Sequence, residues 1–162
     1  MDLLATAEVK TLADVRTVPR SRTNPQFNAE TLPASLAEFG IAYRHLASLG
    51  GLRGRRKDGK ESPNGYWENA SFRNYADYTA TEEFRAGLET LRTMGQRQSC
   101  AIMCAEAVWW RCHRRIIADY LLAAGESVFH ILSPKKIEPA HLTPAARLTA
   151  TGTLVYPEPG QA

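Results

Sequence analysis

The chain lacks any apolar run long enough to cross a membrane: nothing in its 162 residues approaches the roughly 18–20 consecutive apolar residues that a membrane helix needs. Residues 1–10 also lack the basic start and apolar block of a signal peptide, so we expect none. Cysteine is scarce, and Cys100, Cys104 and Cys112 form an odd number within one short segment. This usage argues against a disulfide scaffold and predicts a reducing, cytoplasmic setting.

The chain also lacks a large excess of charge of one sign. Lys and Arg total 20, Asp and Glu total 17, and the net charge of +3 is too small to indicate nucleic-acid binding by itself. The arginines, however, gather in three groups, at positions 16–22, 53–60 and 111–115. Arginine suits bidentate contact with phosphate or carboxylate groups. A solvated basic surface is the alternative explanation, and it is favoured for the second group.

The composition is that of a globular protein, with 44% hydrophobic and 23% charged residues, which excludes wholesale disorder. The length fits one compact domain, and the sequence has no internal repeat. We expect this domain to cover residues 1–140. Residues 141–162 contain several prolines and are expected to form a packed or partly ordered C-terminal tail. The glycine-rich segment 47–66 is a long loop of a kind that is usually functional or mobile.

The apolar pattern predicts alternating strands and helices. The strands are expected at 11–18, 41–46, 100–105 and 127–132, with a further edge strand at 154–156. The helices are expected at 29–39, 67–80, 82–94 and 110–124. Strands that alternate with helices indicate an α/β fold, with a mainly parallel sheet flanked by helices in a single three-layer domain.

The strand order also predicts where a site lies, because ligands of parallel sheets bind beyond the carboxyl ends of the strands. Polar segments follow three of the predicted strands, at 16–22, 45–51 and 104–115. We therefore expect these segments, although far apart in sequence, to meet at one edge of the sheet.

The last of these segments, 104–115, contains the side chains best suited to catalysis. Cys104 and Glu106 end a strand, and a helix then begins with Arg111, His113 and Arg114 in its first turns. The first N–H groups of a helix are unpaired and carry partial positive charge. Basic side chains at that place favour an anion pocket and lower the pKa of a nearby thiol, which produces a nucleophilic thiolate.

The leading hypothesis is an intracellular enzyme that acts on a phosphate-bearing substrate, a nucleotide or nucleic acid, without a cofactor. Its catalytic residues are Cys104 as nucleophile, His113 as proton carrier and Glu106 as orienting group. The substrate-binding residues are Arg16, Arg22, Arg53, Trp110 and Arg114. The alternative is a non-catalytic nucleic-acid-binding module whose basic loops track phosphates and whose tryptophans stack bases. A third possibility is a fold kept for structure or interaction alone.

Each candidate also has a structural explanation. A cysteine on a buried strand is often an inert small hydrophobe, so this role stays open for Cys104 and is favoured for Cys100 and Cys112. His113 can equally well bond to a backbone carbonyl. Cys104, Cys112 and His113 offer three metal ligands, with His45 or His130 as a fourth. Because no C-x-x-C pair exists and adjacent ligands on a helix rarely reach one metal, we expect no metal site.

A set of short motifs, in order along the chain, resembles the domain-of-unknown-function-488 family. The motifs are Asp14-Val-Arg16, Pro19-Arg-Ser-Arg22 with Phe27, Tyr43-Arg-His45, Leu49-Gly-Gly51, Phe84 with Gly87-Leu88, Met103-Cys-Ala-Glu106 and Cys112-His-Arg-Arg115. The resemblance covers roughly residues 8–135, and the Cys-Ala-Glu and Cys-His-Arg strings are its most specific part. It implies an α/β domain with a pocket built from these motifs, and no established activity. Such proteins usually begin with an extra strand and a Gly-His-Ser-like turn, which we expect to be missing here.

Overall fold

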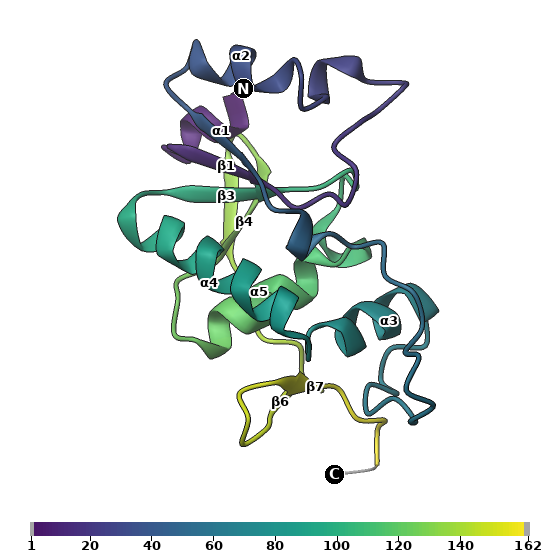
Figure 1. The fold of residues 1–162 in the computed structure, drawn as a ribbon. Helices are drawn as coiled ribbons and strands as arrows, with labels where there is room; N and C mark the ends of the chain where they lie inside the picture. Colours follow the sequence, from purple (N-terminus) through teal and green to yellow (C-terminus); the bar gives the residue numbers. More distant parts are fainter. Residues whose placement is uncertain (1, 161–162) are drawn as a thin grey trace.

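A three-stranded, fully parallel sheet lies at the centre of the computed structural model, which describes residues 2–160 (Figure 1). Its strands are β1 (Thr11–Asp14), β2 (Ala42–His45) and β3 (Cys100–Met103), in the order β2-β1-β3. Thr11 is paired with Ala42 on one side and with Cys100 on the other. All residues of β1 are buried, as expected for the central strand of a parallel sheet.

The helices form where the sequence supplies caps and apolar faces. The α-helices are α1 (Asp2–Thr6), α2 (Leu32–Ala37), α3 (Ala70–Tyr78), α4 (Glu82–Arg97) and α5 (Arg114–Ala123), and the 3-10 turns are η1 (Pro25–Phe27), η2 (Ala47–Leu49) and η3 (Trp109–Arg111). The side chain of Asn69 caps α3 by accepting from the N–H of Ser71 at 2.8 Å, and Thr81 caps α4 in the same way. Among the described residues, no helix is both long and apolar enough to cross a membrane.

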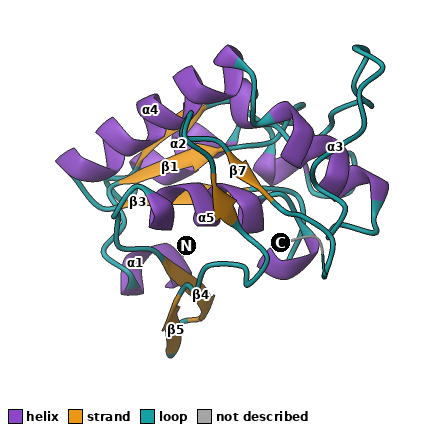
Figure 2. Ribbon diagram, turned by 90° about the horizontal axis from the view of Figure 1, so that it is seen from below, coloured by secondary structure: helices purple, strands orange, loops and turns teal. Residues whose placement is uncertain are grey.

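The two faces of the sheet pack against different sets of elements (Figures 1 and 2). On one face, Ala13 and Val15 join a core cluster with residues of α3, α4 and α5. On the other face, Leu12 joins a smaller cluster with residues of α1 and α2. The expected single three-layer domain is not confirmed, because the second face is covered by two short helices and part of a hairpin rather than by a full helical layer.

The prediction of a fourth strand in the parallel sheet is wrong. That segment forms β4 (Phe129–Ser133), which pairs antiparallel with β5 (Lys136–Pro139) in a separate two-stranded sheet. The two residues between β4 and β5, Pro134 and Lys135, form a short turn that brings β5 back against β4, and such a turn suffices for antiparallel pairing. The expected edge strand at 154–156 also joins another partner: β7 (Leu154–Val155) pairs with β6 (Arg147–Leu148).

The segment after β5 packs against α5. Leu154 and Tyr156 are buried in the larger core cluster. The buried carboxylate of Asp119 on α5 accepts from the N–H of Thr143 at 2.8 Å and from the hydroxyl of Tyr156 at 2.9 Å. These contacts fix the C-terminal segment to the helix that carries the site described below.

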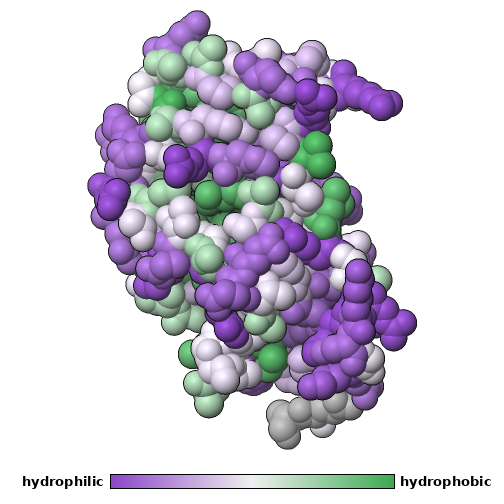
Figure 3. Space-filling view, in the orientation of Figure 1, coloured by the Kyte–Doolittle hydropathy of each residue, from purple (hydrophilic) through white to green (hydrophobic). Residues whose placement is uncertain are grey.

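The surface seen in Figure 3 is mostly hydrophilic, with hydrophobic residues in small separate groups. Exposed large hydrophobic side chains belong to several different elements, including Leu52, Trp110 and Phe129. Single exposed hydrophobic residues of this kind are normal on globular proteins.

Candidate functional site

A cavity of about 390 Å³ lies at the carboxyl ends of the three parallel strands. Arg16 follows β1, Gly51 follows β2, Cys104 follows β3, and all three line this cavity. Cys112 and His113, just before α5, complete the group. The cavity therefore brings together the three polar segments that sequence reasoning assigned to one edge of the sheet.

The exit of β1 is held by a buried ion pair. The carboxylate of Asp14, which has no exposed surface, accepts from Arg16 Nε at 2.8 Å and from Arg16 Nη2 at 2.5 Å. It also accepts from the hydroxyl of Tyr43 at 2.7 Å, and Arg16 Nη2 donates to the carbonyl of Phe27 at 2.7 Å. The hydrogen bond to Asp14 raises the pKa of Arg16, while burial first and Asp14 second raise the pKa of Tyr43 to about 12. Asp14 thus neutralises the charge that Arg16 would bring to an anion.

The two cysteines of the cavity form a hydrogen-bonded pair. Cys104 Sγ lies 3.3 Å from Cys112 Sγ and donates to it, while the N–H of Glu106 donates to Cys104 Sγ at 3.2 Å. Cys112 Sγ also accepts from Arg114 Nε at 2.9 Å and from the Arg114 N–H at 3.3 Å. The carbonyl of Glu106 accepts from Arg114 Nη2 at 2.6 Å, which holds the guanidinium in place.

These contacts separate the acidities of the two thiols. The hydrogen bond from Cys104, then the hydrogen bond and positive charge of Arg114, lower the pKa of Cys112 to about 6, although burial opposes this. The pKa of Cys104 is raised, because its proton is held by Cys112 and because it is buried. The first proton to leave the pair therefore comes from Cys112, and Cys104 keeps the other. The thiolate is Cys112, the cysteine for which the sequence favoured a structural role.

An interruption of the expected helix explains why the sequence favoured a structural role for Cys112. The expected helix at 110–124 is divided into η3 and α5, with Cys112 between them in an extended conformation (φ −137°, ψ 165°). The sulfur therefore sits at the start of α5, where N–H groups are unpaired, rather than within a helical turn. The only sequence signal was the position of Cys112 two residues before Arg114.

His113 ties the site together through its ring. Nε2 lies 2.8 Å from the carbonyl of Val15 and donates to it, and the ring packs edge-on against Tyr75 with centroids 4.9 Å apart. Burial lowers the pKa of His113 to about 4, so the ring is neutral at pH 7. A nitrogen bonded to a backbone carbonyl is poorly placed to carry protons, and the contact instead fixes α5 to the exit of β1.

Gly51 packs directly on this ring and supports a first prediction. A Cβ at Gly51 would meet Nδ1 of His113 and would lie 2.8 Å from Cγ and 2.9 Å from Cε1. Because the ring is partly buried and bonded to Val15, Gly51→Ala is expected to lower the free energy of unfolding by about 1–3 kcal/mol. Denaturant unfolding measures this loss. The matched control is Gly54→Ala in the same loop, where no atom lies within 4 Å of the added Cβ; equal stability of the two variants would contradict the prediction.

Of the other predicted site residues, Glu106 lines this cavity, whereas Arg22 and Arg53 do not. Arg22 is exposed and lies outside its lining. Arg53 donates to the carbonyls of Gly50 at 2.9 Å and Ala47 at 2.8 Å, so it braces the loop. The side chain of Glu106 is exposed, and its backbone groups rather than its carboxylate contact the cysteine pair.

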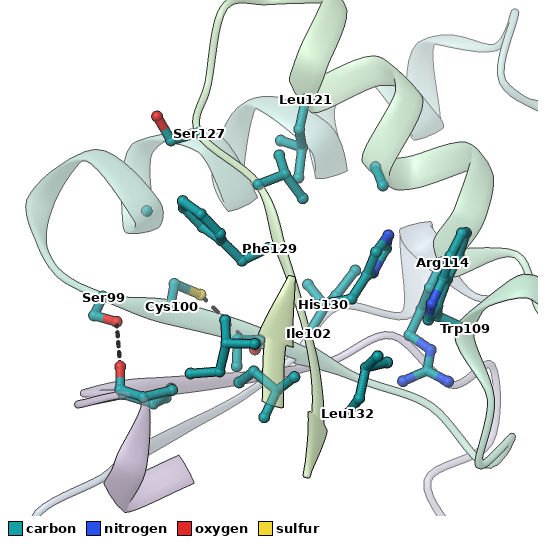
Figure 4. Close-up of a pocket in the computed structure, with 18 of the residues that line it drawn as sticks. Ser99, Cys100, Ile102, Trp109, Arg114, Leu121, Ser127, Phe129, His130 and Leu132 are labelled. Atoms are coloured by element: carbon teal, nitrogen blue, oxygen red, sulfur yellow. Dashed lines mark hydrogen bonds between the residues drawn. The ribbon is translucent and has the colours of Figure 1, made fainter. Parts of the chain in front are cut away.

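Trp110 and Arg114 line a second, larger cavity of about 730 Å³, between β3, α5 and the β4–β5 hairpin (Figure 4). Trp109 stacks on the ring of His130 there, with centroids 3.8 Å apart, so one face of its indole is already covered. Trp110 is 49% exposed. Cys100, whose pKa burial raises to about 11, also lines this cavity. Hydrophobic side chains from β3, α4, α5 and the hairpin form much of the rest of its wall, whereas the smaller cavity lies at the strand ends.

Three side chains offer a possible metal site. Cys104, Cys112 and His113 can place one ligand atom each within 4.8 Å of the others. Two contacts oppose a cation at this place. Arg114 already donates to Cys112 Sγ, and one nitrogen of His113 is bonded to Val15. The arrangement fits a thiolate paired with a guanidinium better than a metal ion.

Comparison with known protein families identifies a family for this chain. The family model described as "Domain of unknown function DUF488" matches residues 1–121, a span that contains the whole cysteine pair and its cavity. No curated protein and no solved structure matches the chain.

Proposed function

The chain therefore belongs to the DUF488 family, and we propose that it is an enzyme in which the Cys112 thiolate attacks the phosphorus of a small phosphate ester, a nucleotide in particular. An S–P bond forms as the P–O ester bond breaks, and the alcohol leaves after taking a proton from water. Water then hydrolyses the S–P bond, which releases phosphate and restores the thiolate. One observation carries the proposal: Cys112 Sγ accepts from Arg114 Nε at 2.9 Å, from the Arg114 N–H at 3.3 Å and from the Cys104 thiol at 3.3 Å, at the wall of a cavity. Such a setting is typical of nucleophilic thiols.

The substrate class follows from the walls of the cavity. Arg111 lines it with an exposed side chain, and no side-chain partner of Arg111 is found among residues 2–160. Asn69 and Ser71 add polar groups, while Phe72 and Tyr75 provide an aromatic wall. A guanidinium beside an aromatic wall suits a phosphate joined to a planar base, and a volume of about 390 Å³ is in the range of small-ligand sites.

The remaining members of the cluster have supporting roles in this proposal. Cys104 stays protonated and donates to the nucleophile. The Glu106 carbonyl orients Arg114, and Asp14 keeps the positive charge of Arg16 from drawing the phosphate away from Cys112. Arg111 thus replaces Arg16 and Arg22 as the group that binds the anion.

The intramolecular pairing of the basic groups favours this proposal over a nucleic-acid-binding module. Arg20 is paired with Glu30 at 2.7 Å, and Arg56 is paired with Asp58 at 2.6 Å. Arg53 is bonded to loop carbonyls and lies 3.7 Å above the ring of Tyr78. Side chains held in this way are less available to follow a phosphate backbone.

The test is protection of Cys112 from alkylation. A nucleoside monophosphate is expected to slow the reaction of Cys112 with iodoacetamide at least tenfold at saturation, inorganic phosphate to slow it less, and the phosphate-free nucleoside least. Peptide mass spectrometry measures the modified fraction of each cysteine in the same sample, so Cys100 serves as an internal reference.

Two arginine variants make the test specific. Arg111→Gln is expected to abolish protection and leave the unprotected alkylation rate unchanged, whereas the matched variant Arg22→Gln is expected to behave like the wild type. Absence of protection by both phosphate compounds would overturn the proposal. Salt-sensitive binding of an oligonucleotide that persists in Cys112→Ser, without protection of Cys112, would favour the nucleic-acid-binding module instead.

A further inference from the structure

We propose that Cys104 and Cys112 are a redox-active pair. A peroxide oxidises Cys112, and Cys104 then forms an intramolecular disulfide with it, which removes the nucleophilic thiolate from the cavity. This inference shares the Cys112 nucleophile with the proposed function, but it needs neither the phosphate-bearing substrate nor Arg111.

The geometry of the sulfur atoms carries the inference. They lie 3.3 Å apart, although the two residues are eight positions apart in sequence. A disulfide requires about 2.05 Å between sulfurs, so the sulfurs must approach by about 1.25 Å. Residues 105–107 in the connecting loop are exposed, and no helix or strand other than the short turn η3 lies between the cysteines. The loop can therefore adjust without disrupting the sheet or α5.

Access distinguishes this pair from the third cysteine. Cys104 and Cys112 both line the cavity at the strand ends, where a molecule as small as hydrogen peroxide fits. Cys100 enters the opposite end of β3 and lines the other cavity. Neither member of the pair has Cys100 as a partner, because the hydrogen bonds of Cys104 and Cys112 go to each other, Glu106 and Arg114.

The chemistry balances in two steps. The Cys112 thiolate attacks one peroxide oxygen, the O–O bond breaks, and Cys112 becomes a sulfenic acid while the departing hydroxide takes a proton to give water. Cys104 then loses its proton, its sulfur attacks the Cys112 sulfur, and the S–O bond breaks to release a second water. Two thiols are oxidised to a disulfide and one hydrogen peroxide is reduced to two waters.

The same contacts explain why the oxidation ends at the disulfide. Arg114 Nε and the Arg114 N–H point at Cys112 Sγ, so they favour the thiolate that starts the first step. Cys104 already touches that sulfur and can trap the sulfenic acid before a second peroxide reacts. Once the disulfide forms, Cys112 has no lone thiolate for Arg114 to stabilise and no nucleophile for a substrate.

The experiment treats the full chain with one equivalent of hydrogen peroxide in the absence of any substrate. The number of titratable thiols is expected to fall from three, the three free cysteines, to one. Peptide mapping is expected to show a Cys104–Cys112 link within one molecule and Cys100 unmodified, and dithiothreitol is expected to restore all thiols.

Three serine variants test the order of events. Cys104→Ser retains a hydroxyl donor and is expected to accumulate Cys112 sulfenic acid, trapped as its dimedone adduct. Cys112→Ser is expected to lose the rapid oxidation, and Cys100→Ser is the matched control that still forms the disulfide. Intermolecular links, pairing through Cys100, or equal dimedone labelling of the wild type and Cys104→Ser would overturn the inference. None of these results depends on substrate protection, so this inference and the proposed function can fail separately.

Discussion

Arg114→Gln is expected to raise the pKa of the Cys112 thiol toward the value of about 8.5 for a free cysteine, because the side-chain hydrogen bond and the positive charge of Arg114 are lost. The alkylation of Cys112 at pH 7 is therefore expected to slow severalfold, since a smaller fraction of the molecules carries the thiolate. The hydrogen bond from Cys104 survives in this variant, which is why the full free-cysteine value is not expected.

The pH profile of Cys112 alkylation measures this change, since its midpoint reports the pKa independently of the reagent. Arg111→Gln is the matched control, because Arg111 lines the same cavity without contacting either sulfur, and its profile is expected to stay at the wild-type midpoint. An unchanged midpoint in Arg114→Gln would show that the guanidinium does not set the acidity of Cys112.

The lowered pKa of Cys112 also makes the free energy of unfolding depend on pH. The folded-state pKa of Cys112 lies below the value of a free cysteine, so its ionisation stabilises the folded state above about pH 8.5, and this contribution is lost as pH falls through about 6. In Arg114→Gln the pKa of Cys112 in the folded state lies closer to that of a free cysteine, so the pH range between the two pKa values narrows. Denaturant unfolding between pH 6 and pH 9 is expected to show a smaller rise in stability for this variant than for the wild type.

Asp14→Ala is expected to cost about 3–5 kcal/mol of unfolding free energy, the usual loss when one partner of a buried ion pair is removed. Arg16 is only 6% exposed. Without the carboxylate, its buried guanidinium would have only the Phe27 carbonyl as a hydrogen-bond partner. Tyr43 would lose the acceptor of its hydroxyl as well. Thermal and denaturant unfolding measure the loss.

Tyr43→Phe is the matched comparison for Asp14→Ala. It removes one donor from the Asp14 carboxylate and leaves the ion pair with Arg16 intact, so the expected cost is about 1–2 kcal/mol. A loss below about 1 kcal/mol in Asp14→Ala would mean that the ion pair is dispensable, and Arg16 would again be available to an anion.

Local pattern was sufficient for the three strands of the parallel sheet, for most of the longer helices and for the place of the cavity at the strand ends. The apolar runs at β1, β2 and β3 and the periodic helices, α4 above all, have a signal within each segment. The rule that ligands bind at strand ends then brought Arg16 and Cys104 to one cavity. The resemblance to the DUF488 family is also confirmed.

The sequence did not show which strands pair with one another or which side chains bond to one another. Nothing in 127–132 distinguishes a strand that joins the parallel sheet from one that turns back on β5. Asp14 reads as an ordinary strand end until its carboxylate is seen to hold both Arg16 and Tyr43. Cys112 reads as a helical residue until the extended break before α5 places its sulfur against Arg114.

The groups that make Cys112 acidic and the groups that shape its cavity come from different stretches of chain. Cys104 and Arg114 lie eight and two positions from Cys112. The walls come largely from residues 16–18, 51–52 and 69–75. Substitutions in those walls can therefore change which molecules fit the cavity without altering the residues that set the acidity of Cys112.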